Sequence, residues 1–203
     1  MNPRIEELMA RIRELQVELE ADLEAKRIEY RYRLDHHRVR FEREVLELHR
    51  RLRTSSLRYL LEARFLHVLS APVIYGAAFP LLLADLAIFA YQSICFPIYG
   101  IPKVRRADHF VYDRGLLPYL NTIEKLNCLY CSYGNGLMSY GREIIARTEQ
   151  YWCPIKHASR LSAPHERYNA FFDYGDAERY SGELGDLRAR LAELENRGTE
   201  RPA

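Results

Sequence analysis

Hydrophobic residues are spread unevenly along this chain, and the longest apolar stretch runs from Phe65 to Pro102. Only His67 and Asp85 can carry a charge within it. A helix crosses the roughly 30 Å hydrocarbon layer of a membrane with about 20 apolar residues, so the stretch is long for one crossing and short for two. The pattern predicts a membrane-associated segment that separates two charged arms.

Prolines interrupt the apolar stretch, and Pro80 lies near its middle. A single transmembrane helix would place one of the two basic flanks on the far side of the membrane, against the tendency of such flanks to stay in the cytoplasm. We therefore favour a hairpin or re-entrant dip that turns near Pro80, and a buried core hairpin of a soluble helical bundle is the alternative. The basic flanks are Arg53, Arg58 and Arg64 before the stretch and Lys103, Arg105 and Arg106 after it.

Asp85 is the only acidic residue of the apolar stretch. A carboxylate is costly in lipid, so we expect this membrane-embedded polar residue to face protein, water or a partner subunit. A functional role and a buried hydrogen bond to Tyr91 or to the backbone are both open.

The N-terminal arm shows a helical pattern. Its apolar residues recur with 3-4-3-4 spacing at Ile5, Leu8, Ile12, Leu15 and Leu19, as in a coiled-coil seam. No glycine precedes Gly76, which favours one long helix, although the stripe weakens after Leu23 and a bend near residues 25–35 is the alternative. The arginines from Arg31 to Arg53 are suited to binding anionic lipid head groups. The alternative is a solvated helix face on which they pair with glutamates.

The C-terminal arm repeats this seam. Aromatic residues between Tyr168 and Tyr174 precede a 3-4-3 stripe of Leu184, Leu187, Leu191 and Leu194. Antiparallel pairing of the two arms within one chain is the simplest way to bury both stripes, and pairing between chains is the alternative.

A cluster with metal-ligand spacing follows the apolar stretch, in the pattern C-x2-C-x21-C-x3-H: Cys128, Cys131, Cys153 and His157. Residues three apart on a helix have Cβ atoms about 5–6 Å apart, so two thiolates can share a zinc or iron ion. Pro154 favours a new helix after Cys153, whose N-terminal amides would stabilise a thiolate. We expect one structural Zn or Fe ion, with a thiol redox pair or unliganded packing as alternatives.

Composition narrows the function classes. The 203 residues carry a formal net charge of +2, so no basic excess is present to hold nucleic acid, and we expect no such partner. Charged residues within the first twenty positions argue against a signal peptide, and four cysteines are too few for a disulfide-rich secreted scaffold. The sequence contains no P-loop, G-x-G-x-x-G, G-x-S-x-G or H-E-x-x-H motif.

One segment carries a resemblance. The stretch YLNTIEKLNCLYCSYGNG, followed by ARTEQYWCPIKHA, resembles a motif of uncharacterised bacterial membrane-associated proteins. The similarity extends from about His36 to Tyr180. That family has no assigned activity, substrate or cofactor, so the resemblance implies bacterial origin and membrane association alone.

These patterns predict an all-α protein in four parts. They are a charged coiled-coil arm (1–64), a membrane-embedded or re-entrant apolar hairpin (65–102), a helical Cys/His module (103–160), and an aromatic segment with a C-terminal helix (161–203). We expect a non-enzymatic scaffold at the inner membrane, with both arms in the cytoplasm and coiled-coil arms that bind a protein partner or a second copy. The alternative is a membrane-bound thiol redox or metal-handling enzyme that uses the same cysteines.

Overall fold

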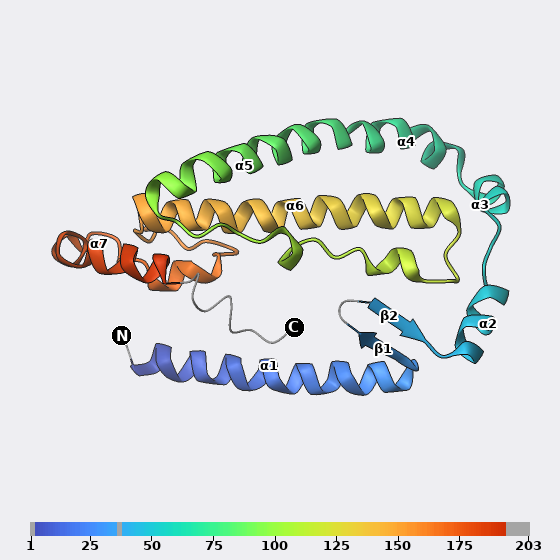
Figure 1. The fold of residues 1–203 in the computed structure, drawn as a ribbon, viewed down its shortest axis with the longest axis horizontal. Helices are drawn as coiled ribbons and strands as arrows, with labels where there is room; N and C mark the ends of the chain where they lie inside the picture. Colours follow the sequence, from blue (N-terminus) through green and yellow to red (C-terminus); the bar gives the residue numbers. More distant parts are fainter. Residues whose placement is uncertain (1–2, 36–37, 194–203) are drawn as a thin grey trace. The chain divides into compact units, whose positions relative to one another are not determined.

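The computed structural model describes residues 3–35 and 38–193, and these are mainly α-helical, as predicted (Figure 1). The chain forms two compact units, residues 1–59 with 113–125 and residues 60–112 with 126–203. The predicted four parts were consecutive, whereas the second unit combines the apolar stretch with the cysteine-bearing helix because these two segments pack together.

The first unit contains α1 (Pro3–Glu29), a β-hairpin and α2 (Arg43–Arg51). The hairpin pairs β1 (Tyr32–Asp35) with β2 (Arg38–Phe41) in antiparallel register, and the rings of Tyr32 and Phe41 lie 5.6 Å apart. Arg31 between α1 and β1 has a positive φ of 51°, which ends the helical path. The single long helix that the sequence favours is therefore wrong, and the alternative of a bend near residues 25–35 is confirmed, although the two strands were missed. Their signal was the two-residue alternation of Tyr32 with Leu34 and of Val39 with Phe41.

The apolar stretch forms one helical path rather than a hairpin. After α3 (Ser56–Glu62), α4 (Phe65–Gly76) continues into α5 (Ala78–Tyr99) through Ala77, whose φ and ψ of −65° and −13° are helical. The predicted turn near Pro80 is wrong. Pro80 lies in the first turn of α5, where a missing backbone N–H is tolerated.

The chain reverses instead at Gly100, which ends α5 with a positive φ of 64° while the Ile101 N–H donates to the Phe96 carbonyl. Residues 101–112, called the strap below, then run back along α5 and include the short 3₁₀ helix η1 (Arg106–Asp108). The Gln92 side chain accepts a 2.7 Å hydrogen bond from the Val104 N–H and holds the strap in place.

After η2 (Asp113–Leu116), Asn121 starts α6 (Thr122–Trp152). Its Oδ1 accepts from the N–H groups of Ile123 and Glu124, and the Glu124 carboxylate accepts from the Asn121 N–H at 2.8 Å. This reciprocal capping fixes the start of the helix. The chain then passes through η3 (Glu166–Ala170) into α7 (Ala177–Ala192).

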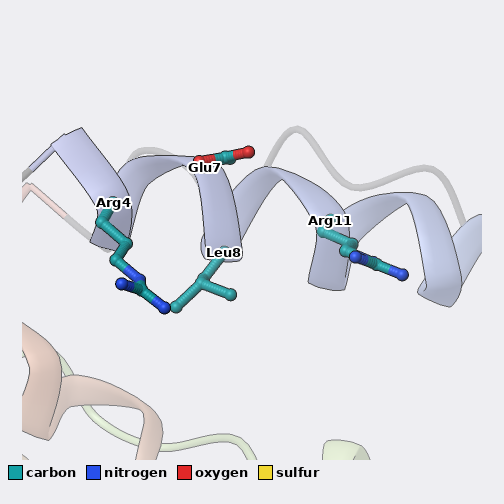
Figure 2. A pocket seen from close by; sticks show the side chains of 4 residues that line it. All are labelled: Arg4, Glu7, Leu8 and Arg11. Atoms are coloured by element: carbon teal, nitrogen blue, oxygen red, sulfur yellow. The ribbon is translucent and has the colours of Figure 1, made fainter.

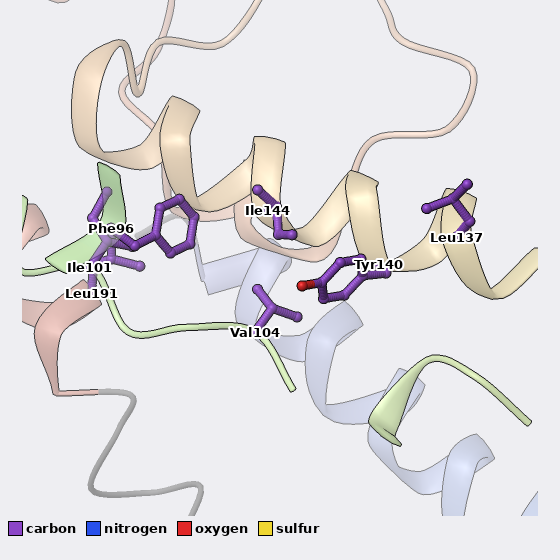
Figure 3. Packing of buried hydrophobic residues seen from close by; sticks show 7 residues of the cluster. All are labelled: Phe96, Ile101, Val104, Leu137, Tyr140, Ile144 and Leu191. Carbon is purple, nitrogen blue, oxygen red and sulfur yellow. The ribbon is translucent and has the colours of Figure 1, made fainter. Parts of the chain in front are cut away.

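The core of the second unit joins α5, the strap, α6 and α7 (Figure 3). Leu187 and Leu191 of α7 are buried in this unit, and Leu191 belongs to its core. The α1 stripe, in contrast, is exposed. The predicted pairing of the two arms within one chain is therefore wrong, because α7 uses its apolar stripe within its own unit. Leu194 and the side chain of Ile5 lie outside the described residues. The core cluster is Phe96, Ile101, Val104, Leu137, Tyr140, Ile144 and Leu191.

Candidate functional site

The α4–α5 run has a continuous apolar surface. Between Ala71 and Tyr99 every exposed residue is apolar, and the large side chains among them are 50–77% exposed. At about 1.5 Å per residue this surface is roughly 40 Å long. The run Phe65–Tyr99 is long and apolar enough to cross a membrane. We call this surface the apolar face; its large side chains are Val73, Ile74, Phe79, Leu82, Leu83, Leu86, Phe89, Ile94 and Ile98.

The opposite side of α4–α5 carries polar groups that bond to α6. The Tyr75 hydroxyl donates to the Asn127 amide oxygen, and the hydroxyls of Tyr91 and Thr148 lie 2.9 Å apart. Tyr75 thus meets the first part of α6, and the later residue Tyr91 meets its last part. The α4–α5 run and α6 therefore lie side by side and run in the same direction (Figure 1). Contacts with α6 therefore hold the polar side of α5 inside the protein.

Asp85 is the centre of the polar side. Its carboxylate accepts two hydrogen bonds from the Arg106 guanidinium, one of them 2.9 Å long, and a third of 2.9 Å from the Tyr133 hydroxyl. Of the three surroundings expected for Asp85, the structure shows protein, but its partner is not Tyr91, which pairs with Thr148. Burial, and then the hydrogen bond to Asp85, raise the pKa of Tyr133 to about 12, so this hydroxyl stays protonated and donates.

Arg106 links the strap to both helices. Its guanidinium lies 4.3 Å from the ring centre of Phe110 and 5.2 Å from that of Tyr140. The hydrogen bond that Arg106 donates to Asp85 raises the pKa of Arg106 above its usual value. The two side chains therefore form an ion pair at neutral pH. The three hydrogen bonds that Asp85 accepts all join elements of the fold, which assigns this residue a structural role.

Close packing brings the strap and α5 against two glycines of α6. A Cβ at Gly136 would lie 2.7 Å from the Phe110 ring, and one at Gly141 would lie 3.0 Å from the Ile88 side chain. These approaches need hydrogen in place of a side chain. Gly136 therefore serves close contact between α6 and the strap.

A second charged network lies in the C-terminal half of α6. Glu143 accepts from Arg147 at 2.9 Å and from Arg167 at 2.5 Å, and Arg147 also donates to the Pro102 carbonyl. Burial pushes the pKa of Glu143 upward, but hydrogen bonds from Arg167 and Arg147 outweigh it, so the pKa falls below its usual value. The i, i+4 pair was visible in the sequence; the contact with Arg167 depends on the fold.

The four predicted metal ligands fall into two groups. Cys128 and Cys131 lie one turn apart on α6, whereas Cys153 follows the end of this continuous helix. At about 1.5 Å per residue, roughly 30 Å separates Cys131 from Cys153. His157 belongs to the second group, with Cys153. Its ring stacks on the Tyr168 ring, with 6.2 Å between the ring centres. Residues 3–35 and 38–193 contain no group of three or more His, Cys, Asp or Glu side chains that could hold a metal ion.

The prediction that Pro154 begins a new helix is wrong. The Pro154 carbonyl accepts from the Phe172 N–H at 2.9 Å, and the Lys156 N–H donates to the Phe172 carbonyl at 2.8 Å, so this segment forms a β-bridge. The Cys153 N–H donates to the Glu149 carbonyl and thus continues the C-terminal end of α6. Cys153 therefore does not lie at a helix N-terminus, which removes the geometric basis for its proposed activation.

An apolar groove of about 290 Å³ lies between α5 and α6 beside the apolar face. Ile88, Met138 and Ile145 are among its lining residues, and the last two are more than half exposed. Apolar surface therefore continues from α5 onto α6 at this point.

No protein-family model, curated protein or solved structure matches this chain. The resemblance to bacterial membrane-associated proteins stays a prediction, and the case for function depends on the geometry described above.

Proposed function

We propose that this protein is a membrane-surface scaffold whose apolar face lies in the lipid interface. The observation that carries the proposal is that every exposed residue between Ala71 and Tyr99 is apolar. Soluble monomers rarely expose contiguous apolar patches of more than a few hundred Å². Burial of such a surface in lipid is favourable by roughly 25 cal/mol per Å².

The charges of the second unit favour a helix that lies in the membrane plane over one that crosses the bilayer. Because α6 packs along α5, a crossing would carry Arg142, Glu143 and Arg147 into the hydrocarbon layer, at high cost. An in-plane orientation leaves α6 on the aqueous side. It also keeps both basic flanks on the cytoplasmic side of the membrane without a turn at Pro80.

The flanking residues support the cytoplasmic leaflet as the location. Arg64 precedes the helical run, Lys103 and Arg105 follow it, and all three are exposed. An in-plane helix brings both ends to the head groups, where each basic side chain near anionic lipid contributes about 1 kcal/mol. We therefore propose the cytoplasmic face of the inner membrane, with the soluble arms available to partners.

The cysteines have no part in this proposal as a four-ligand site, because Cys131 and Cys153 of one chain are about 30 Å apart along α6. A thiol redox enzyme would have to rely on Cys128 and Cys131 alone. The proposed scaffold role depends on the apolar face and not on the cysteines.

Flotation with anionic phospholipid vesicles tests the proposal. The double variant Leu82→Glu/Leu86→Glu places two carboxylates on the apolar face, and each lost leucine removes about 1.5–3 kcal/mol of burial, so vesicle partition should fall by about 100-fold or more. Val17→Glu, at an equally exposed position of α1, is the matched control and should bind like the unmodified chain. Equal binding by the double variant would contradict a lipid role for the face.

Labelling distinguishes the in-plane helix from a crossing. Arg64→Cys and Arg105→Cys are made separately in a chain whose four native cysteines are serine, and each protein is added to closed vesicles. A membrane-impermeant maleimide should label both positions from outside. Protection of one end alone would show a transmembrane helix instead.

A further inference from the structure

The exposed stripe of α1 has the width of a helix-pairing surface. Leu8, Ile12, Leu15 and Leu19 follow one another at 4-3-4 spacing and are 49–58% exposed. Charged side chains flank the stripe, as Figure 2 shows for Arg4, Glu7 and Arg11 around Leu8. A seam one side chain wide is the pattern that another helix covers by knobs-into-holes packing.

The apolar stripe of α7 is already used in its own unit, where Leu187 and Leu191 are buried. We propose that α1 pairs with α1 of a second copy in the antiparallel orientation. Leu8 then lies opposite the partner's Leu19, and Ile12 lies opposite the partner's Leu15. In this register, the four exposed apolar residues of each α1 lie opposite the four of the other α1.

The charges beside the stripe select this orientation. With Ile12 at heptad position a and Leu15 at position d, Arg11 and Glu18 both occupy position g. Antiparallel helices bring g beside g, so Arg11 meets the partner's Glu18, and the same ion pair forms a second time by symmetry. Both side chains are exposed and can reach across.

A parallel pair is less favourable for two reasons. Position g would then face position e of the partner, which places Arg11 beside the partner's Gln16 and Glu18 beside the partner's Leu23, without an ion pair. It would also place Asp22, at a d position, against the partner's Asp22 inside the seam. The antiparallel register moves the two Asp22 residues to opposite ends, and like charges in a seam oppose association.

Charge reversal tests the pairing in the full-length protein in detergent micelles, where vesicle binding plays no part. Arg11→Glu and Glu18→Arg should each replace two attractions by two repulsions and weaken self-association about tenfold or more. An equal mixture of the two variants restores both ion pairs and should associate like the unmodified chain. Sedimentation measures the association, and circular dichroism confirms that each variant is folded.

Matched controls lie on the other side of α1. Arg13→Glu and Glu20→Arg make the same charge changes at heptad position b and should leave association unchanged. Failure of the mixture to recover association, or an equal effect of the controls, would overturn the proposed register.

Cross-linking tests the orientation directly. Leu8→Cys and Leu19→Cys proteins, each without the native cysteines, are mixed and oxidised. The antiparallel pair should yield mainly the mixed disulfide between positions 8 and 19. Disulfides between identical positions would show a parallel pair, and a chain that stays monomeric at all concentrations would contradict the proposal while leaving the vesicle result intact.

Discussion

α1 and the α4–α5 run expose their leucines to a similar extent, but they differ in the residues between those leucines. Leu8 and Leu15 of α1 are 54% and 56% exposed, and Leu82 and Leu83 of α5 are 56% and 52% exposed. On α1 the neighbouring exposed positions are mostly charged. On α5 they are apolar without exception from Ala71 to Tyr99.

The width of an apolar surface, rather than the exposure of one leucine, therefore indicates what covers it. A stripe one residue wide buries itself against another helix, whereas a broad face needs an extended surface such as lipid. The polar groups follow the same division: those of α1 face water, whereas Asp85, Tyr91 and Gln92 of α5 face inward and are hydrogen-bonded.

The largest expected effect comes from the inward polar side of α5. Asp85→Ala leaves Arg106 without its carboxylate, and because the Asp85 and Arg106 side chains are 15% and 39% exposed, we expect a loss of about 2 kcal/mol, below the value for a fully buried pair. Glu29→Ala breaks the exposed Lys26–Glu29 pair of α1 and should leave the free energy of unfolding nearly unchanged, because solvent screens this pair. Denaturant unfolding measures both changes, and equal effects would contradict the division.

The contact between the strap and α6 should give an effect of similar size. Gly136→Ala would place a Cβ 2.7 Å from the Phe110 ring, so the strap must shift, at a cost of about 1–3 kcal/mol. Gly134→Ala, two residues away, meets only Leu81 at 3.8 Å and should stabilise the helix by about 0.5–1 kcal/mol. Thermal unfolding of the two variants should therefore change in opposite directions, and a shared sign would show that the strap does not press on Gly136.

Some features of this fold could be predicted from the sequence, and others could not. The all-α class followed from helical spacing on α1 and α7, and the apolar stretch followed from composition. The turn at Pro80 was wrong because proline breaks a helix only away from its first turn, and the first-turn position of Pro80 depends on where α5 begins.

A related reason explains why one chain does not bring the predicted metal ligands together. The spacing C-x2-C-x21-C-x3-H suits one ion if the chain folds back between Cys131 and Cys153, but α6 is continuous over that interval and holds them apart. The contacts of Asp85 with Arg106 and Tyr133 span 21 and 48 residues, so no local pattern could identify them. In contrast, the antiparallel ion pairs proposed for α1 need only the heptad register, which the sequence contains.

A smaller effect should appear with pH. The pKa of Glu143 is lowered in the folded state, so its ion pairs stabilise the fold above the ordinary value of 4.5 and lose that contribution as the pH falls through the lower folded value. Glu143→Gln should therefore destabilise the protein at neutral pH, and the difference from the unmodified chain should shrink in acid. Unfolding curves from neutral to acidic pH measure this difference, which should persist at high salt because the network is partly buried. A constant difference at all pH values would show that the carboxylate charge has no role.

The smallest effect is expected at Cys128 and Cys131. If α6 keeps them about 30 Å from Cys153, a single chain cannot complete a site of three thiolates and one imidazole. Purified protein should then contain zinc and iron well below one atom per chain, and Cys128→Ser/Cys131→Ser should change stability by less than about 0.5 kcal/mol, as for substitutions on a helix surface. Elemental analysis and unfolding on the same preparation measure both quantities. One metal atom per chain, lost in the double variant, would return the cysteines to the functional site, and because one helix cannot bring its two ends together, the remaining ligands would have to come from a second copy.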